Sequence, residues 1–309
     1  NHSSPFFSPS LMCAGLVEVN PHSAYPSEDR WFKAEAFFSP PVPVSPMTTV
    51  LIITNALSLF FLGWLGLNYC KQRDRRNGRK TLGANPIPHV PAGEIDPSFT
   101  LSRAQAPSLN SQVLFVGSAD TLGGTSDTEA WILAGLAKSA KRIFELGTCT
   151  GKTTYLMALN SPDDAQVVTT TLPPGEGDNL VQQAGDDPEA LIAARKESQV
   201  TEYYYEDTPQ AAKITQLYGD SLHFDTTPYR HHFDLLFIDG AHAASYVQSD
   251  SQKAFEMVAP GGLIVWHDYA PRMPGVWDTL NQLKKQGYAL KHIKSTTMVA
   301  YRAPMAPAD

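Results

Sequence analysis

Short apolar runs alternate with amphipathic stretches along residues 112–309. The runs lie at 142–146, 166–171, 233–238 and 262–266, and polar residues or turns follow them. Between the last two, one helical face collects Val247, Ala254, Phe255 and Val258. Continuous apolar strands suit a parallel sheet that is covered on both faces, and a period of 3–4 residues suits the covering helices. The pattern therefore predicts an α/β sheet with helices on both faces.

The remaining elements complete this layout. Ser126 or Asp127 can cap a helix that carries Ile132, Leu133 and Leu136 inward. Further helices are expected at 152–159, 189–196 and 276–286, and further strands at 214–218, 290–293 and 298–301. The last two strands are predicted to close the sheet as a pair.

A separate apolar run, residues 50–67, contains no charge and is followed by a block of lysines and arginines. Trp64 and Tyr69 suit the membrane interface. We predict a transmembrane helix over 47–70, and the positive-inside rule places the C-terminal side in the cytoplasm. The protein is thus expected to be single-pass, with a cytoplasmic catalytic domain. A signal peptide carries its positive charge before the apolar run, and a core helix is not usually followed by a basic block.

The other boundaries follow from composition. Residues 1–46 are rich in Pro, Ser and Phe and are expected to be a disordered or non-native extension, with Met47 as a candidate initiator. Residues 71–111 read as a basic juxtamembrane segment and then a proline-containing linker or wrapping arm. The catalytic domain is expected over 112–309.

The net charge of the 309-residue chain is −7, so nucleic acid is not expected as a partner. Its cysteines, Cys13, Cys70 and Cys149, are far apart and odd in number, which does not suit a disulfide framework. No pattern specifies an oligomeric state.

The strongest chemical signal is the turn after the first strand, Glu145-Leu-Gly147-Thr-Cys-Thr-Gly151-Lys-Thr. Its glycines permit a sharp turn and close approach of a ligand, and the following helix offers free N–H groups. A P-loop would need a glycine where Leu146 stands, and a dinucleotide fingerprint would need one at Cys149. The pattern that remains is Glu-x-Gly-x-x-x-Gly.

This turn, together with Phe-Ile-Asp-Gly-Ala-His over 237–242 and Trp-His-Asp-Tyr over 266–269, resembles the class I S-adenosylmethionine-dependent methyltransferases from about Thr125 to about Tyr301. The resemblance implies a Rossmann-like, seven-stranded, mostly parallel sheet with a C-terminal antiparallel hairpin. It also implies S-adenosyl-L-methionine as cofactor.

The cofactor residues implied by the resemblance are Glu145, Gly147, Thr148, Gly151, Thr171, Asp220 and Asp239. Glu145 could accept the methionine amine, or could instead cap a helix or form an ion pair. Thr171 stands where the family usually has an acid for the ribose hydroxyls, which puts cofactor affinity in question. Asp220 fits the adenine side, or a turn aspartate.

Four side chains at strand ends form the candidate reaction centre: Asp239, His242, His267 and Asp268. In one interpretation Asp239 and Asp268, with His267 as a third candidate, hold a cation such as Mg²⁺ that acidifies the acceptor hydroxyl. In the other, His242 or His267 is a general base and no metal is needed. A third interpretation leaves His267 as a hydrogen-bond partner of a neighbouring loop.

We therefore expect methyl transfer by in-line displacement to a hydroxyl oxygen of a small molecule or sugar. Residues 176–200 are a candidate lid, and Tyr203–Tyr205 either line the acceptor pocket or pack the sheet edge. The alternatives are a non-catalytic S-adenosylmethionine-binding module at a membrane, supported by Thr171, and an NAD-dependent oxidoreductase, disfavoured by the missing middle glycine.

Overall fold

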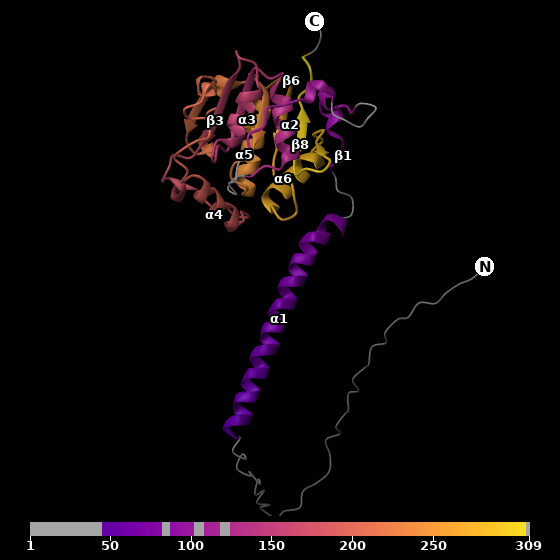
Figure 1. Cartoon of the computed structure of the whole chain (residues 1–309), viewed down its shortest axis with the longest axis vertical. Coiled ribbons are helices and arrows are strands. Elements are labelled where there is room, and N and C mark those ends of the chain that lie inside the picture. Colours follow the sequence, from indigo (N-terminus) through magenta and orange to yellow (C-terminus); the bar gives the residue numbers. More distant parts are fainter. Residues whose placement is uncertain (1–44, 82–86, 102–107, 118–123, 307–309) are drawn as a thin grey trace, which may run out of the picture. The chain divides into compact units, whose positions relative to one another are not determined.

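The computed structural model describes residues 45–81, 87–101, 108–117 and 124–306 (Figure 1). Almost all of the predicted N-terminal extension, residues 1–44, lies outside the described residues. The chain divides into two compact units, Asn1–Leu62 and Gly63–Asp309.

Helix α1 (Pro46–Thr81) contains the predicted membrane segment. Ser45 caps its first turn by accepting from the backbone N–H of Thr48 at 3.2 Å, and Pro46 occupies the first helical position, where its missing N–H costs nothing. Over Pro46–Tyr69, 24 residues, the helix is long and apolar enough to cross a membrane, and none of it is buried within the described part of the chain. The helix continues into the predicted basic segment as far as Thr81.

The large unit is an α/β sandwich built on one sheet. Its strands are β1 (His89–Val90), β2 (Arg142–Leu146), β3 (Gln166–Thr171), β4 (Ile214–Tyr218), β5 (Phe233–Ile238), β6 (Val258–Trp266), β7 (Lys291–Ile293) and β8 (Val299–Arg302). The order is β1-β7-β8-β6-β5-β2-β3-β4. Strand β8 is antiparallel to β6 and β7, and the other pairs are parallel. The Rossmann-like sheet and its C-terminal antiparallel pair agree with the predictions.

Besides the C-terminal part of α1, five α-helices lie in the described part of this unit: α2 (Asp127–Ala137), α3 (Lys152–Asn160), α4 (Pro188–Glu197), α5 (Ala244–Met257) and α6 (Pro274–Lys285). Short 3₁₀ turns lie at Ala92–Glu94, Pro97–Phe99, Leu109–Ser111, Gly177–Asn179, Pro209–Lys213, Ser221–His223 and Thr227–Tyr229. Val258, predicted on the helical face, instead begins β6.

Alternate residues of the central strands enter two separate cores. In β2, Phe144 packs into the core with α5 and α6, whereas Ile143 packs into the core with α2 and α3. In β5, Leu236 packs into the core with α5 and α6, and Leu235 packs into the core with α2 and α3. Because successive strand residues point to opposite faces, this alternation confirms helices on both sides of the sheet.

The predicted linker supplies an eighth strand, so the expectation of seven strands is corrected. β1 pairs parallel with β7, and Ile87 beside it is fully buried. The ring of Phe99 packs against α2 at Gly135, where an added Cβ would lie only 2.6 Å from the ring. Residues 87–101 therefore pack as a wrapping arm, the second of the two predicted alternatives, and the domain boundary at 112 stays a prediction.

This arm should contribute to global stability. Phe99→Ala removes a buried ring and is expected to lower the free energy of unfolding by about 3–5 kcal/mol. The measurement is chemical denaturation of the full chain in mild detergent, followed by tryptophan fluorescence. Leu101→Ala, at an exposed arm position, is the matched control and should change it by less than about 0.5 kcal/mol. Equal effects of the two variants would contradict a packed arm.

Candidate functional site

The turn between β2 and α3 packs backbone against backbone on the end of β5. Gly147 has a φ of 103°, and a Cβ there would lie 2.2 Å from the carbonyl oxygen of Asp239. The N–H of Asp239 donates to the carbonyl of Leu146 at 2.8 Å. Only glycine fits this approach, since both the conformation and the space exclude a side chain.

Gly151 begins the helix that follows the turn, and its contact with a cofactor stays a prediction. It is the N-cap of α3 with a φ of 73°, and a Cβ there would lie 2.7 Å from the ring of Tyr205. It lines neither of the two cavities beside the turn. Tyr203 and Tyr205, stacked 5.3 Å apart, are buried against the turn, so they pack the sheet side rather than line a pocket.

Glu145 is fully buried beneath the turn. One oxygen accepts from Thr154 of α3 and from Thr169 of β3, the latter at 2.7 Å. Oε1 has no hydrogen-bond partner among the described residues. Burial raises the pKa of Glu145 to about 7, against the lowering effect of the threonine hydroxyls. It forms no ion pair there and lines neither cavity, so its contact with a cofactor amine stays a prediction.

Two adjoining cavities share Gly147, Cys149 and Glu197. The first, about 60 Å³, contains the predicted Thr171 and Asp220 in its wall. The second, about 170 Å³, contains Thr148 and the four residues of the predicted reaction centre, Asp239, His242, His267 and Asp268. The fold thus brings nearly all the predicted site residues to one crevice at the carboxyl ends of the strands, as expected for an open α/β sheet.

Residues of the segment predicted as a lid cover this crevice. Leu180, Ala194 and Ser198 line the first cavity, and Leu180 and Leu191 pack with Tyr246 of α5. Both cavities are smaller than the roughly 300–1,000 Å³ of ordinary ligand pockets. Residues of α4 and its flanks therefore form part of the crevice wall.

Asp220 is a turn aspartate, as one of its two predicted interpretations has it, and its contact with adenine stays a prediction. Its Oδ1 accepts from the N–H of Leu222 at 2.9 Å, which caps a 3₁₀ turn, and its Oδ2 accepts from the Tyr246 hydroxyl at 3.3 Å. It also lines the first cavity. A turn aspartate is therefore present on the wall of the crevice.

Asp250 is a crevice residue that sequence reasoning missed. It is 1% exposed, lines the first cavity, and its Oδ1 has no hydrogen-bond partner within the described ranges. Burial raises its pKa to about 7. The available signal was its place between Val247 and Ala254, on the apolar face of the predicted helix.

At the centre of the second cavity, His242 lies between two carboxylates. Its Nε2 is 3.5 Å from Asp239 Oδ1 and 3.5 Å from Asp268 Oδ2. One ligand atom from each of these residues lies within 4.8 Å of the others, which suits a cation. The structure thus brings the predicted metal residues Asp239 and Asp268 together, with His242 rather than His267 as the third member. Asp268 has a φ of 55°, an uncommon conformation for a non-glycine residue.

Two carboxylates lie beside His267 and shift its pKa. His267 Nδ1 is 3.1 Å from Asp239 Oδ1, and its Nε2 is 3.4 Å from Glu129 Oε2. Burial alone would lower the pKa of His267, but these two carboxylates hold it well above its usual value. The raised pKa favours the imidazolium, which has no free lone pair, and the role of His267 as a general base stays a prediction.

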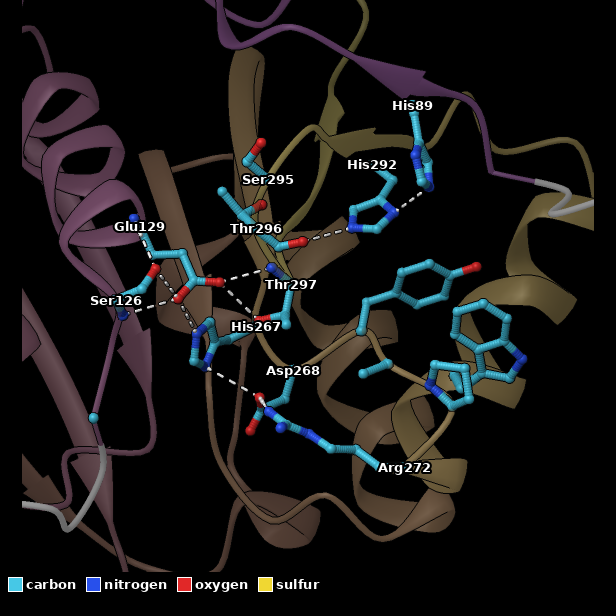
Figure 2. A pocket seen from close by; sticks show the side chains of 15 residues that line it. His89, Ser126, Glu129, His267, Asp268, Arg272, His292, Ser295, Thr296 and Thr297 are labelled. Carbon is cyan, nitrogen blue, oxygen red and sulfur yellow. Dashed lines mark hydrogen bonds and ion pairs between the residues drawn. The ribbon is translucent and has the colours of Figure 1, made fainter. Parts of the chain in front are cut away.

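Glu129 is the second missed residue, because the capping box Ser126-x-x-Glu129 already accounts for it in the sequence. In the structure its Oε1 accepts from the N–H and hydroxyl of Thr297, at 2.7 and 2.8 Å, while Oε2 faces His267 (Figure 2). Burial opposes ionisation, but the bonds from His267 and Thr297 keep the pKa of Glu129 below its usual value.

Glu197, at the end of α4, is the third site residue that sequence reasoning missed. It borders both cavities, and burial raises its pKa to about 7, helped by the charges of Asp239 and Asp268. It lies in the least family-like part of the sequence, where no motif could have indicated it. The candidate lid therefore brings an acid to the reaction centre.

Comparison with known proteins finds a methyltransferase domain in the segment that contains most of this site. Residues 144–269 match the family model for the methyltransferase domain. No curated protein matches. The solved structures that resemble the chain include methyltransferase PaMTH1 of Podospora anserina bound to SAH, the O-methyltransferase TomG of Streptomyces achromogenes with SAM, and an O-methyltransferase of Bacillus cereus with SAH. Their identities are 14%, 16% and 16%, and their TM-scores are 0.41, 0.39 and 0.39. The matches cover 60%, 58% and 58% of this chain and 81%, 82% and 83% of theirs.

The charge of His267 can be tested through Glu129. Glu129→Gln removes one carboxylate and should lower the pKa of His267 by roughly one unit or more. Histidine-labelled protein titrated by NMR reports this pKa, with the resonance assigned by loss in His267→Gln. Glu94→Gln, an acid near Lys291, should leave it unchanged. An unaltered pKa of His267 in Glu129→Gln would contradict the interaction between Glu129 and His267.

Asp250 should make stability depend on pH. Its pKa is raised in the folded state, so its contribution is full below the unfolded pKa and is lost as pH rises towards about 7. Between pH 5 and pH 8, the free energy of unfolding should therefore fall by about 2–3 kcal/mol less in Asp250→Asn than in the parent. Denaturation at both pH values measures this, and Asp163→Asn, at an exposed site, is the control. Parallel pH dependences of Asp250→Asn and the parent would show that Asp250 is ionised in the fold.

Proposed function

Because residues 144–269 carry an S-adenosylmethionine-dependent methyltransferase domain, we propose that the chain transfers a methyl group to a hydroxyl oxygen of a small-molecule acceptor. The observation that carries this proposal is the junction at Gly147, where the cofactor turn meets Asp239 at the end of β5. The named O-methyltransferases among the similar structures support oxygen as the atom that is methylated.

The residues of the crevice fit the cofactor. Gly147 has no side chain and lines both cavities, so a ligand can approach its backbone. The Oδ1 atom of Asp250, which has no hydrogen-bond partner among the described residues, offers a polar group in the first cavity. The cofactor would also contact Thr148, Thr171 and Asp220, which line the same crevice. S-adenosylmethionine supplies an electrophilic methyl group, so the protein must orient the acceptor and manage one proton.

His242 is the residue we assign to that proton. It lies in the second cavity between Asp239 and Asp268. Burial would lower its pKa, but the two carboxylates raise it above its usual value. The neutral, proton-accepting form therefore gains population as pH rises through this raised pKa, and activity should rise with it.

A divalent cation is the second mechanism, and the spacing of ligand atoms from Asp239, His242 and Asp268 favours it. Such a cation, for example Mg²⁺, would lower the pKa of the acceptor hydroxyl directly. Activity that survives chelation but is lost in His242→Ala supports the base. Loss on chelation with rescue by Mg²⁺ supports the cation.

We also propose that α1 anchors the protein in a membrane with the catalytic domain in the cytoplasm. Its apolar length over Pro46–Tyr69 and the basic residues that follow in the sequence support this. Protease protection in sealed vesicles tests it, since digestion of the catalytic domain from the non-cytoplasmic side would reverse the orientation.

Cofactor identity is tested by calorimetric titration of the full chain with SAH, NAD and ATP. SAH alone should bind, and Gly147→Ala should weaken it at least about tenfold, because the new methyl group displaces Asp239 from the turn. Gly287→Ala is a matched control: its φ of 102° equals that of Gly147 within a degree, but nothing lies within 4 Å. SAH bound without turnover of any acceptor would favour the non-catalytic module, and NAD bound in its place would favour the oxidoreductase.

A further inference from the structure

A third cavity, of about 600 Å³, adjoins the reaction centre. It shares Gly124, His267 and Asp268 with the second cavity, so a molecule within it can reach the groups that handle the proton. Its volume is in the range of ordinary small-molecule pockets. Much of its lining comes from outside the matched segment 144–269, including the wrapping arm and the residues after β6.

One side of this cavity carries four rings in successive contact, which we call the ring wall: Trp277, Tyr269, His292 and His89. Trp277 stacks on Tyr269 with centroids 4.4 Å apart and an interplanar angle of 17°. His292 meets Tyr269 edge-on at 5.1 Å, and His89 meets His292 edge-on at 4.3 Å. Tyr269 is buried, Trp277 and His292 are half-buried, and His89 is exposed.

Hydrogen bonds fix the rings in place. His292 Nε2 donates to the carbonyl of Thr296 at 2.8 Å, so its Nδ1 accepts from His89 Nε2 at 2.8 Å (Figure 2). The Tyr269 hydroxyl donates to Asn281 Oδ1 at 2.7 Å. A wall held this way presents oriented ring surface to a ligand without further ordering.

Three hydroxyls that line the cavity are committed to neighbouring groups of the protein. The hydroxyls of Ser126 and Thr297 both bond to Glu129, at 2.7 and 2.8 Å. The hydroxyl of Thr296 donates to the carbonyl of Ile293 at 2.9 Å. A sugar, with hydroxyls around its whole ring, would leave many of them without partners here, and that costs free energy.

We propose that the ring wall binds the planar ring of an aromatic alcohol and directs its hydroxyl to Asp268 and the adjoining reaction centre. This inference rests on the proposed function and narrows its acceptor from small molecule or sugar to a ring of the phenol type. Stacking and edge contacts favour such a ring over a saturated one of equal size. The wall residues outside the matched segment, His89, Trp277 and His292, set this preference.

The test compares three simple probes: phenol, cyclohexanol and methyl glucoside. Their binding to the full chain in mild detergent is measured by saturation-transfer NMR, with and without SAH. Phenol should bind roughly fivefold more tightly than cyclohexanol, and the glucoside most weakly. Trp277→Leu should abolish the difference between phenol and cyclohexanol, and His89→Ala, at an exposed position, should reduce it.

Tyr288→Leu is the control, because Tyr288 stacks on Phe255 and does not line the cavity. Equal binding of phenol and cyclohexanol, tighter binding of the glucoside, or an unchanged preference in Trp277→Leu with native circular dichroism would overturn the inference. SAH affinity is measured in parallel on the parent and on both wall variants. Failure of SAH to bind the parent counts against the proposed function alone, since the probes bind a different cavity.

Discussion

The contact between the turn at Gly147 and the carbonyl of Asp239 is the constraint on which the rest of the site depends. It joins the carboxyl ends of β2 and β5, which are neighbours in the sheet. From that junction the first cavity extends along β3 and β4, and the second extends towards β6. A side chain at 147 would separate the two strand ends and, with them, the cofactor crevice from the acids.

The pKa values of buried carboxyl groups within this small volume are shifted in opposite directions. Burial opposes ionisation at all of them, but His267, which lies between Asp239 and Glu129, lowers the pKa of both. Glu145 and Asp250 have no such cation beside them, and burial raises their pKa to about 7. The position of one histidine thus separates two kinds of buried acid.

The sequence specified the sheet closely, because uninterrupted apolar runs and glycine turns are local signals. Strands β2 and β3 have the predicted bounds, and Asp239, His242 and Asp268 meet as their positions at strand ends required. What could not be predicted depends on contacts distant in sequence. β1 pairs with a strand some two hundred residues away, Glu129 meets His267 across the sheet, and Glu197 reaches the site only through the packing of α4. Tyr205 packs beside Gly151 through a contact of the same kind, which the family motif does not indicate.

The two-residue strand β1 also changes the rim of the sheet. Without it, β7 would present its outer row of backbone N–H and carbonyl groups to any extended chain nearby. Pairing of His89 and Val90 with His292 and Ile293 occupies that row with a segment too short to recruit another strand. The arm therefore protects the molecule against edge-to-edge association with its own copies.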